Sequence, residues 1–315
     1  MKKIKIITLL ISLIVIGLFL TGCSTTKNFH SLKNISKNLV DPSELVSGGP
    51  PEDGIPSIDN PEFLSIEESI WIDDSAEVFV LVVNDTVKVY PQSILVWHEI
   101  VNDELAGTPI AITYCPLCGS SVAYKRIING TSVEFGTTGL LYNSNLVLYD
   151  RTTGSYWTQI RGQAIIGDLA GEMLEKIPLQ TMAWRDVKNR FKSARVLSRK
   201  TGYSRSYGND PYSDYYEREE ILFPVKNIDS KYELNTKTIV IGITVNNEPK
   251  AYTEFDLLTA ENITDRVGGN SLFFKMEKDG FLTIENIDTG EMIPWERDFW
   301  FAWFAFHPET TLYSK

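Results

Sequence analysis

A stretch of this chain recurs 162 residues further on, and this internal repeat limits the possible folds more than any other feature of the sequence. Residue types are kept across that spacing from Phe79 and Ile241 to Ile112 and Phe274, both at apolar positions and at turns. The identical pairs are Val83 and Val245, Asn84 and Asn246, Lys88 and Lys250, Tyr90 and Tyr252, Asp103 and Asp265, and Gly107 and Gly269. Such a constant spacing predicts two copies of one supersecondary unit.

The second copy is expected to be the shorter one. A later match has a spacing of 116 residues and relates Trp184, Val196 and Leu197 to Trp300, Leu312 and Tyr313. The difference, 162 − 116 = 46 residues, is then the extra length of the first copy. We therefore expect a first repeat unit over residues 48–200, a Tyr-rich connector over 201–231 and a second, shorter unit over 232–315.

Most local patterns in the two copies are those of strands. Residues 79–83 and 87–90 alternate around Asn84-Asp85, which is typical of a hairpin. Residues 121–126 and 132–136 indicate another hairpin around Asn129-Gly130, and residues 109–114 an apolar strand. Helices are expected only at residues 92–97 and at the aromatic residues 299–308. The chain is thus predicted to be a β-rich α+β protein in which two diverged copies pack together.

The first 22 residues indicate a bacterial lipoprotein signal peptide. Basic residues precede an apolar run from Ile6 to Leu20, which is short for a transmembrane helix, and Cys23 follows where that run ends. In a lipoprotein this cysteine is acylated and becomes the new N-terminus. We therefore expect an extracytoplasmic protein anchored to the cell membrane by lipid. The alternative is a plain signal anchor with an incidental cysteine.

The residues after the signal peptide indicate a tether followed by an arm. Residues 23–47 are polar and predict a flexible tether, whereas the Pro- and Gly-rich residues 48–61 predict an extended arm lying on the domain. Without the three lysines of the signal peptide, 27 basic residues face 41 acidic ones, which gives a net charge of −14. A chain this acidic is not expected to bind nucleic acid by releasing counterions.

Once Cys23 is assigned to lipidation, Cys115 and Cys118 are the only cysteines left for chemistry. They lie in Thr-Tyr-Cys-Pro-Leu-Cys-Gly, residues 113–119. Pro116 restricts the turn between the thiols, and Gly119 is suited to the positive φ that leaves both sulfurs on one side. This pattern is that of a metal-binding knuckle or of an exchangeable disulfide.

The repeat provides an internal control for this motif. At the spacing of 162 residues, His98 corresponds to Ala260, Cys115 to Glu277 and Cys118 to Gly280. Residues that only maintain the fold should occur in both copies, and these three do not. We therefore expect one asymmetric site in the first copy, with the second copy structural, packing on the first or covering the site.

A transition-metal site is the leading hypothesis for that chemistry. Cys115, Cys118 and His98 would be ligands, with Glu99 or a distant residue such as His307 completing the set. Thiolates and imidazole suit zinc or copper, and a site short of one ligand would be open for catalysis or for transfer to a metal donor or acceptor protein.

Two other hypotheses for the role of Cys115 and Cys118 remain. They could form a structural or redox disulfide, which is natural outside the cytoplasm, although residues 119–124 indicate a turn and a strand rather than the helix that usually follows a redox pair. Alternatively, the cysteines are structural in a module that binds a cell-surface ligand through its tyrosines and tryptophans. A Ser/His/Asp hydrolase is disfavoured because no Gly-x-Ser-x-Gly motif occurs, and there is no phosphate-binding or dinucleotide fingerprint.

The extra length of the first copy contains candidates for a pocket lining, because polar residues there alternate with apolar ones. These candidates are Tyr142, Asn143, Ser144, Asp150, Arg151, Trp157 and Gln159. The simpler alternative is a pair of strands in which Asp150 and Arg151 form a local charge pair.

Five motifs together resemble a family of exported prokaryotic proteins known as domain-of-unknown-function family 3179. They span Gly48 to Pro61, Trp97 to Asp103, Thr113 to Gly119, Leu141 to Arg151, and Gly202 to Tyr216. The motifs are long, and the resemblance covers nearly the whole chain after the signal peptide. It implies no activity, because none is known for the family.

Overall fold

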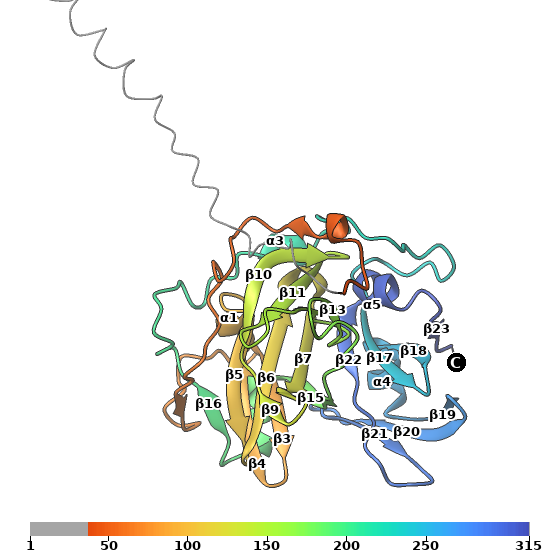
Figure 1. Ribbon diagram of the computed structural model, residues 1–315. Coiled ribbons are helices and arrows are strands. Elements are labelled where there is room, and N and C mark those ends of the chain that lie inside the picture. Colours follow the sequence, from red (N-terminus) through yellow and green to blue (C-terminus); the bar gives the residue numbers. More distant parts are fainter. Residues whose placement is uncertain (1–36, 315) are drawn as a thin grey trace, which may run out of the picture. The chain divides into compact units, whose positions relative to one another are not determined.

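The computed structural model describes residues 37–314, shown as coloured ribbon in Figure 1. The predicted signal peptide, Cys23 and the first part of the predicted tether lie outside the described residues. Within residues 37–314 the elements are mostly strands with a few short helices, which confirms the expected β-rich α+β class. No helix among the described residues is long and apolar enough to cross a membrane.

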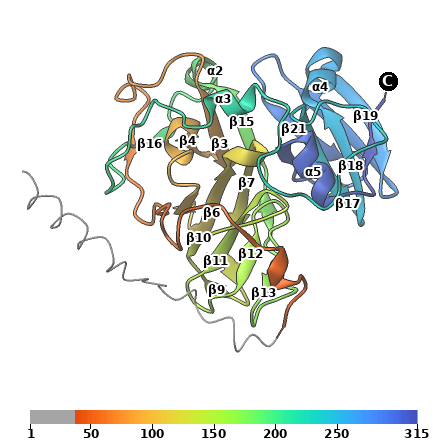
Figure 2. The same ribbon diagram turned by 90° about the horizontal axis from the view of Figure 1, so that it is seen from above.

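The largest sheet combines strands from two separate stretches of the described chain, residues 100–177 and 239–312. Its order is β23 (Thr311–Leu312), β18 (Glu248–Thr253), β17 (Ile239–Val245), β22 (Glu296–Phe299), β7 (Ser120–Lys125), β6 (Thr108–Cys115) and β5 (Ile100–Leu105), with β14 (Lys176–Ile177) also paired to β7. In Figure 2, β17 and β18 lie in blue on one side of β7, and β6 lies on the other side of β7.

Two five-stranded sheets and two smaller ones complete the β-structure. One sheet has the order β15 (Leu179–Ala183), β3 (Glu77–Val83), β4 (Thr86–Pro91), β16 (Arg195–Leu197) and β2 (Phe63–Leu64). The other, named here the cover sheet, has the order β1 (Val46–Ser47), β10 (Phe135–Tyr142), β11 (Asn145–Asp150), β12 (Tyr156–Thr158) and β13 (Ala164–Ile166). The smaller sheets are β19 (Asn262–Val267), β20 (Asn270–Met276) and β21 (Leu282–Asn286), and the pair β8 (Ile127–Ile128) and β9 (Thr131–Ser132).

The helices are short and lie between strands. They are α1 (Gln92–Leu95), α2 (Trp184–Arg190), α3 (Ser213–Tyr216), α4 (Glu254–Ala260) and α5 (Trp300–Phe306), with 3₁₀ turns η2 (Pro42–Glu44) and η3 (Pro116–Cys118). The predicted helix over residues 92–97 is thus shorter, and that over 299–308 begins after Phe299. The side chains of α5 are almost all buried, as expected for a helix that is apolar all round.

Residues 77–125 and 239–286, named here the first unit and the second unit, have the same order of elements. β3, β4, α1, β5, β6 and β7 are matched in order by β17, β18, α4, β19, β20 and β21. The hairpin registers agree as well, since Phe79 pairs with Tyr90 and Ile241 with Tyr252. After each unit comes a strand that pairs with its first strand, β15 on β3 and β22 on β17.

The predicted turn at Asn129-Gly130 forms, but the strands around it differ from the expectation. Both residues have positive φ, as a tight two-residue hairpin requires. They join only β8 and β9, while β7 pairs with β6 instead. β7 therefore pairs within the largest sheet, and the turn at Asn129-Gly130 joins only a two-residue ladder.

The predicted tether ends earlier than residue 47, whereas the predicted arm lies on the domain. Leu39 donates its N–H to the carbonyl of Ile165, and Val46 pairs with Leu141 in the cover sheet. In the arm, Ile58 is buried and its backbone hydrogen-bonds Ile100 and Asn102 of β5.

Candidate functional site

The Cys-Pro-Leu-Cys-Gly motif forms the connection between two neighbouring strands of the largest sheet. β6 ends at Cys115, η3 carries the second cysteine, and β7 starts at Ser120, which pairs with Cys115. Gly119 has a φ of +58°, and a Cβ added there would lie 2.8 Å from the ring of Phe299. A side chain at this position would therefore meet both backbone strain and a clash.

Both thiols are buried, and they interact with each other. Cys115 and Cys118 are free cysteines with 1% and 0% of their surface exposed. They belong to a core formed by the largest sheet, the cover sheet and α5. The two cysteines lie at either end of η3, and each of them shifts the pKa of the other. The site is thus a buried dithiol pair rather than two separate cysteines.

The surroundings make the two thiols unequal. Burial alone would raise the pKa of Cys115, but the hydrogen bond from Cys118 and the backbone N–H groups of Leu146, Cys118 and Leu117 lower it below its usual value. Burial raises the pKa of Cys118 well above its usual value, and the charges of Cys115 and Asp298 add to this effect. Cys115 is therefore the thiol that carries negative charge more readily.

The cover sheet reaches Cys118 through the turn between β10 and β11. The Cys118 sulfur is 3.4 Å from the carbonyl oxygen of Ser144 and 3.6 Å from the amide nitrogen of Asn145. Asn145 donates to Gln159 at 2.8 Å, and Gln159 donates to Thr113 at 3.1 Å. Ser144 and Gln159 of the predicted lining therefore do lie beside the thiols, together with Asn145, which the sequence did not single out.

Two further residues of the predicted lining lie next to α5 instead. Asn143 donates to the carbonyl of Ala305 and accepts from the N–H of Lys226. The ring of Tyr142 packs edge-on against Phe306 at 5.9 Å. They connect the cover sheet to the helix rather than to the cysteines.

The remaining three lining candidates hold the cover sheet together. Asp150 is fully buried and accepts hydrogen bonds from Trp157 at 3.0 Å and from Thr153. Arg151 donates to Asp59 of the arm at 2.6 Å. The expected alternative of a charge pair between Asp150 and Arg151 is therefore wrong, because the Arg151 guanidinium pairs with Asp59, Glu134 and Asp53 instead.

His98 lies close to the motif but has both ring nitrogens engaged. Its Nδ1 donates to the carbonyl of Pro56 at 2.7 Å, and its Nε2 accepts from the hydroxyl of Tyr207 at 2.6 Å. Burial lowers the pKa of His98, which favours the neutral ring that this pattern requires. The ring therefore ties the arm to the connector and directs no lone pair to the thiols.

Glu99 is the predicted ligand that does lie near a thiol. Its side chain is buried, and its backbone has a φ of +58°, which is uncommon for a residue other than glycine. Burial raises the pKa of Glu99 well above its usual value, and the negative charge of Cys115 adds to this rise. Both effects favour the protonated form of the Glu99 carboxyl.

The predicted metal ligands are not assembled around one point in this structure. Within residues 37–314, no three His, Cys, Asp or Glu side chains come close enough to share an ion. His307 is buried and stacks on Trp303 at 4.0 Å between ring centres, at the end of α5.

The connector covers the site, which the sequence analysis did not foresee. The hydroxyl of Tyr215 donates to the carbonyl of Leu117 at 2.9 Å, inside the motif. Tyr216 shares a hydrogen bond with Tyr114, and Tyr207 binds His98. The high density of tyrosines in residues 203–216 was the available signal, because aromatic side chains in a polar segment need a surface to bury against.

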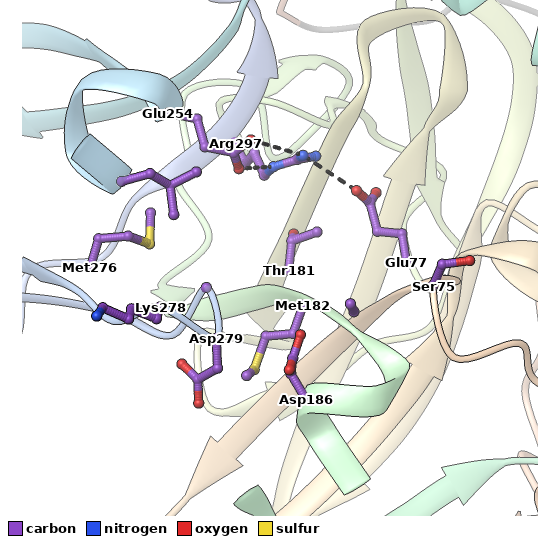
Figure 3. A pocket seen from close by; sticks show the side chains of 13 residues that line it. Ser75, Glu77, Thr181, Met182, Asp186, Glu254, Met276, Lys278, Asp279 and Arg297 are labelled. Carbon is purple, nitrogen blue, oxygen red and sulfur yellow. Dashed lines mark hydrogen bonds and ion pairs between the residues drawn. The ribbon is translucent and has the colours of Figure 1, made fainter. Parts of the chain in front are cut away.

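Two hollows lie on the other face of the largest sheet. One, of about 330 Å³, is lined by Tyr114, Gly119, Tyr216, Phe299 and neighbouring polar residues. The second, of about 260 Å³, is shown in Figure 3. Arg297 and Glu77 line both, and Arg297 pairs with Glu77 of β3 and with Glu254 of α4, as the dashed lines show.

Comparison with known proteins gives one match. The family model described as "Protein of unknown function (DUF3179)" matches residues 52–294, most of the chain. Neither a curated protein nor a solved structure matches the sequence.

Proposed function

The chain belongs to the DUF3179 family, whose function is unknown, and from this premise we propose that it is a thiol–disulfide protein with Cys115 and Cys118 as its redox pair. The observation that carries this proposal is the placement of two free, buried cysteines at either end of one 3₁₀ turn, and the pKa of Cys115 is lowered while that of Cys118 is raised. A nucleophilic and a resolving cysteine need that difference.

The proposed reaction is exchange with a disulfide-bearing partner protein or peptide. The Cys115 thiolate attacks one sulfur of the partner disulfide, a mixed disulfide forms, and the other partner sulfur leaves as a thiolate. Cys118 then loses its proton and attacks the Cys115 sulfur, which releases the second partner sulfur. Two electrons pass from the cysteine pair to the partner, and the reverse sequence reduces the pair.

Access to the pair requires movement of the connector. Tyr212 and Tyr216 pack on the core that contains both cysteines, and Tyr215 is bonded to Leu117 between them. Tyr215→Phe removes that bond and keeps the ring. We expect it to accelerate alkylation of the thiols by iodoacetamide several-fold, and an unchanged rate would show that the connector is not the barrier.

The test of the proposal is redox titration of the purified chain in glutathione buffers, with acid quenching, alkylation and mass spectrometry. We expect the native protein to lose two hydrogens as the buffer becomes oxidising. Cys118→Ser should accumulate a mixed disulfide with glutathione at Cys115, and Cys115→Ser should form much less. Two thiols that stay reduced at every buffer ratio would refute the proposal.

The zinc or copper site expected from the sequence remains a separate, untested prediction, as does a partner protein that would donate or accept the metal. Metal analysis of the same preparation checks it. Stoichiometric metal that disappears in Cys115→Ser and survives in His98→Ala would support a site without the imidazole. Metal-free protein that still titrates would leave the redox function standing alone.

For localisation we propose the arrangement that the signal peptide predicts, with Cys23 acylated and the domain outside the cytoplasm. An oxidising compartment suits a disulfide-forming pair. Metabolic labelling with a fatty acid should mark the native protein and not Cys23→Ser. A labelled Cys23→Ser variant would contradict the assignment.

We also infer that the first and second units descend from one duplicated unit. Support comes from their identical element order and from the agreement of the registers β3–β4 with β17–β18. Expression of residues 232–315 alone would test whether the second unit folds independently, as a duplicated domain should.

A further inference from the structure

The second unit's following strand places a carboxyl group next to the cysteine site. β22 and β7 are antiparallel and pair Arg297 with Ser121, so Asp298 lies opposite Ser120. Ser120 in turn pairs with Cys115 across β6 and β7. Asp298, Ser120 and Cys115 thus form one row on the face that carries the thiols.

Asp298 is buried without the partners that a structural carboxylate normally has. None of its surface is exposed, and neither carboxyl oxygen has a hydrogen-bond partner of good geometry among residues 37–314. The Ser120 hydroxyl, also buried, is equally without such a partner there. Leaving these groups unpaired in a core costs stability, so a merely structural role would favour an apolar residue.

The first unit shows what that apolar residue would be. β15 pairs with β3 as β22 pairs with β17, and Met182 opposite Val78 corresponds to Asp298 opposite Val240. Met182 is buried in an apolar cluster. The same architectural position therefore accepts methionine where no cysteine pair is near.

We propose that Asp298 is the residue that receives the proton of Cys118 when the disulfide closes. This inference rests on the proposed thiol–disulfide function. In the mixed disulfide between Cys115 and the partner, the Cys118 proton passes to the Asp298 carboxylate. The Cys118 sulfur then bonds to the Cys115 sulfur, and the partner thiolate leaves and takes up that proton.

The charged surroundings of Asp298 are consistent with a group that changes its protonation. Burial raises the pKa of Asp298 to about 6, while Ser120, Lys176 and Arg297 oppose that rise. The titratable or charged groups that interact electrostatically with it are Lys176 on β14, Arg297 on β22, Tyr124 on β7 and Cys118 on η3. Glu296 and His307 in turn surround Lys176.

Of these neighbours, Lys176 titrates in the same pH range as Asp298, whereas His307 does not. Burial lowers the pKa of Lys176 to about 7, and this lysine pairs with Glu296. Burial lowers the pKa of His307 to about 3, so the ring stays neutral near pH 6. A test must therefore separate Asp298 from Lys176, and substitution of each residue in turn does so.

The experiment follows closure of the mixed disulfide in the full chain. Reduced protein is mixed with oxidised glutathione, samples are acid-quenched, and the glutathionylated and closed forms are counted by mass spectrometry between pH 5 and 8. In the native protein the closure rate should rise through about pH 6, as Asp298 becomes a carboxylate able to accept a proton. A profile without this rise overturns the inference, whatever the variants show.

Two substitutions sharpen the test. Asp298→Asn keeps the shape, and Asp298→Met supplies the residue that stands at the matching place in the first unit. Both should slow closure by about 100-fold and remove the rise near pH 6, because the proton acceptor is gone. Met182→Asp serves as a control and should keep the native profile. Lys176→Met should keep the rise but move it to higher pH, because Lys176 lowers the pKa of Asp298.

The outcomes separate this inference from the proposed function. If the native protein never closes a disulfide, the thiol–disulfide function itself fails. If it closes, and Asp298→Met is folded and closes at the native rate with the native pH profile, only the role of Asp298 fails. If both variants fold poorly, the native pH profile compared with that of Lys176→Met decides the question.

Discussion

The first and second units each contain a polar cluster of the same three residue types. They differ at the ends of their fourth strands, β6 and β20. In the first unit, Lys88 pairs with Asp103 at 2.8 Å and Tyr90 donates to the same carboxylate at 2.8 Å. In the second unit, Lys250, Asp265 and Tyr252 repeat both contacts at 2.6 Å and 2.7 Å. Residues kept in both units stabilise the hairpin and the strands packed on it.

The end of the fourth strand is core in one unit and surface in the other. Cys115 ends β6 inside a core, whereas Glu277 follows β20 and pairs with Arg190 at a partly exposed position. This difference in burial follows from the environment of the strand after each connection, β7 or β21. β7 is paired on both sides and packs beneath the cover sheet, while β21 is an edge strand.

The cover sheet is built largely from residues that follow the first unit. β10 to β13 occupy residues 135–166, between β7 and β15, where the second unit has only the short link from β21 to β22. That insertion supplies Ser144, Asn145 and Gln159 around Cys118. The comparison therefore teaches that the cover sheet, and not the element order common to both units, buries the strand connection that carries the cysteines.

The largest effect is expected from the glycines of the two strand connections. Gly119→Ala combines a positive φ with a Cβ 2.8 Å from the Phe299 ring and should cost about 3 kcal/mol of unfolding free energy. Gly280→Ala also has a positive φ, but the nearest atom would be 3.5 Å away, so about 1 kcal/mol is expected. Urea unfolding of both variants measures the difference, and equal costs would contradict the contrast between the buried and the exposed connection.

The next effect concerns the ion pairs that join the two regions. Arg297→Met leaves Glu77 and Glu254 without their shared partner, and only 12% of the Arg297 side chain is exposed. We expect a loss of about 2 kcal/mol, reduced from the value for fully buried pairs because both carboxylates reach solvent. Arg190→Met is the matched control, with a more exposed side chain bound to Glu277 and Asp279, and should lose about 1 kcal/mol or less in the same denaturation assay.

A smaller effect tests whether the matching polar clusters contribute equally to the free energy of unfolding in both units. Tyr90→Phe and Tyr252→Phe each remove one hydrogen bond to a carboxylate from a buried ring. Each should cost about 1.5 kcal/mol, measured by thermal and denaturant unfolding. Costs that differ by more than about 1 kcal/mol would break the equivalence of the two clusters.

The smallest effect is a pH dependence in the second unit. Although burial opposes it, the hydrogen bonds from Lys250 and Tyr252 lower the pKa of Asp265 below its usual 3.8. A lowered pKa stabilises the fold above the unfolded value, and this stability is lost as the pH falls through the folded value. The destabilisation by Lys250→Met should therefore shrink below about pH 4, and a constant difference down to pH 2 would contradict this role.

Much of the site could be anticipated from local patterns, and the exceptions have physical causes. The turn at Gly119 follows from residue types and sequence order, whereas Ser144 and Gln159 were expected only as parts of a pocket lining. His98 was expected to be a ligand, yet partners from the arm and the connector engage both its nitrogens. Neither partner is near His98 in the sequence, so no local pattern could reveal them.

The sequence by itself determined the order of the elements, the matched positions of the two units and the tight turn that brings two thiols together. These depend on backbone preferences and on side-chain periodicity over a few residues. Only the tertiary structure decided that the thiols are buried under the cover sheet and the connector, and that Asp298 stands in their row. Those features depend on the pairing of β22 with β7, which joins distant segments through a register that local preferences do not encode.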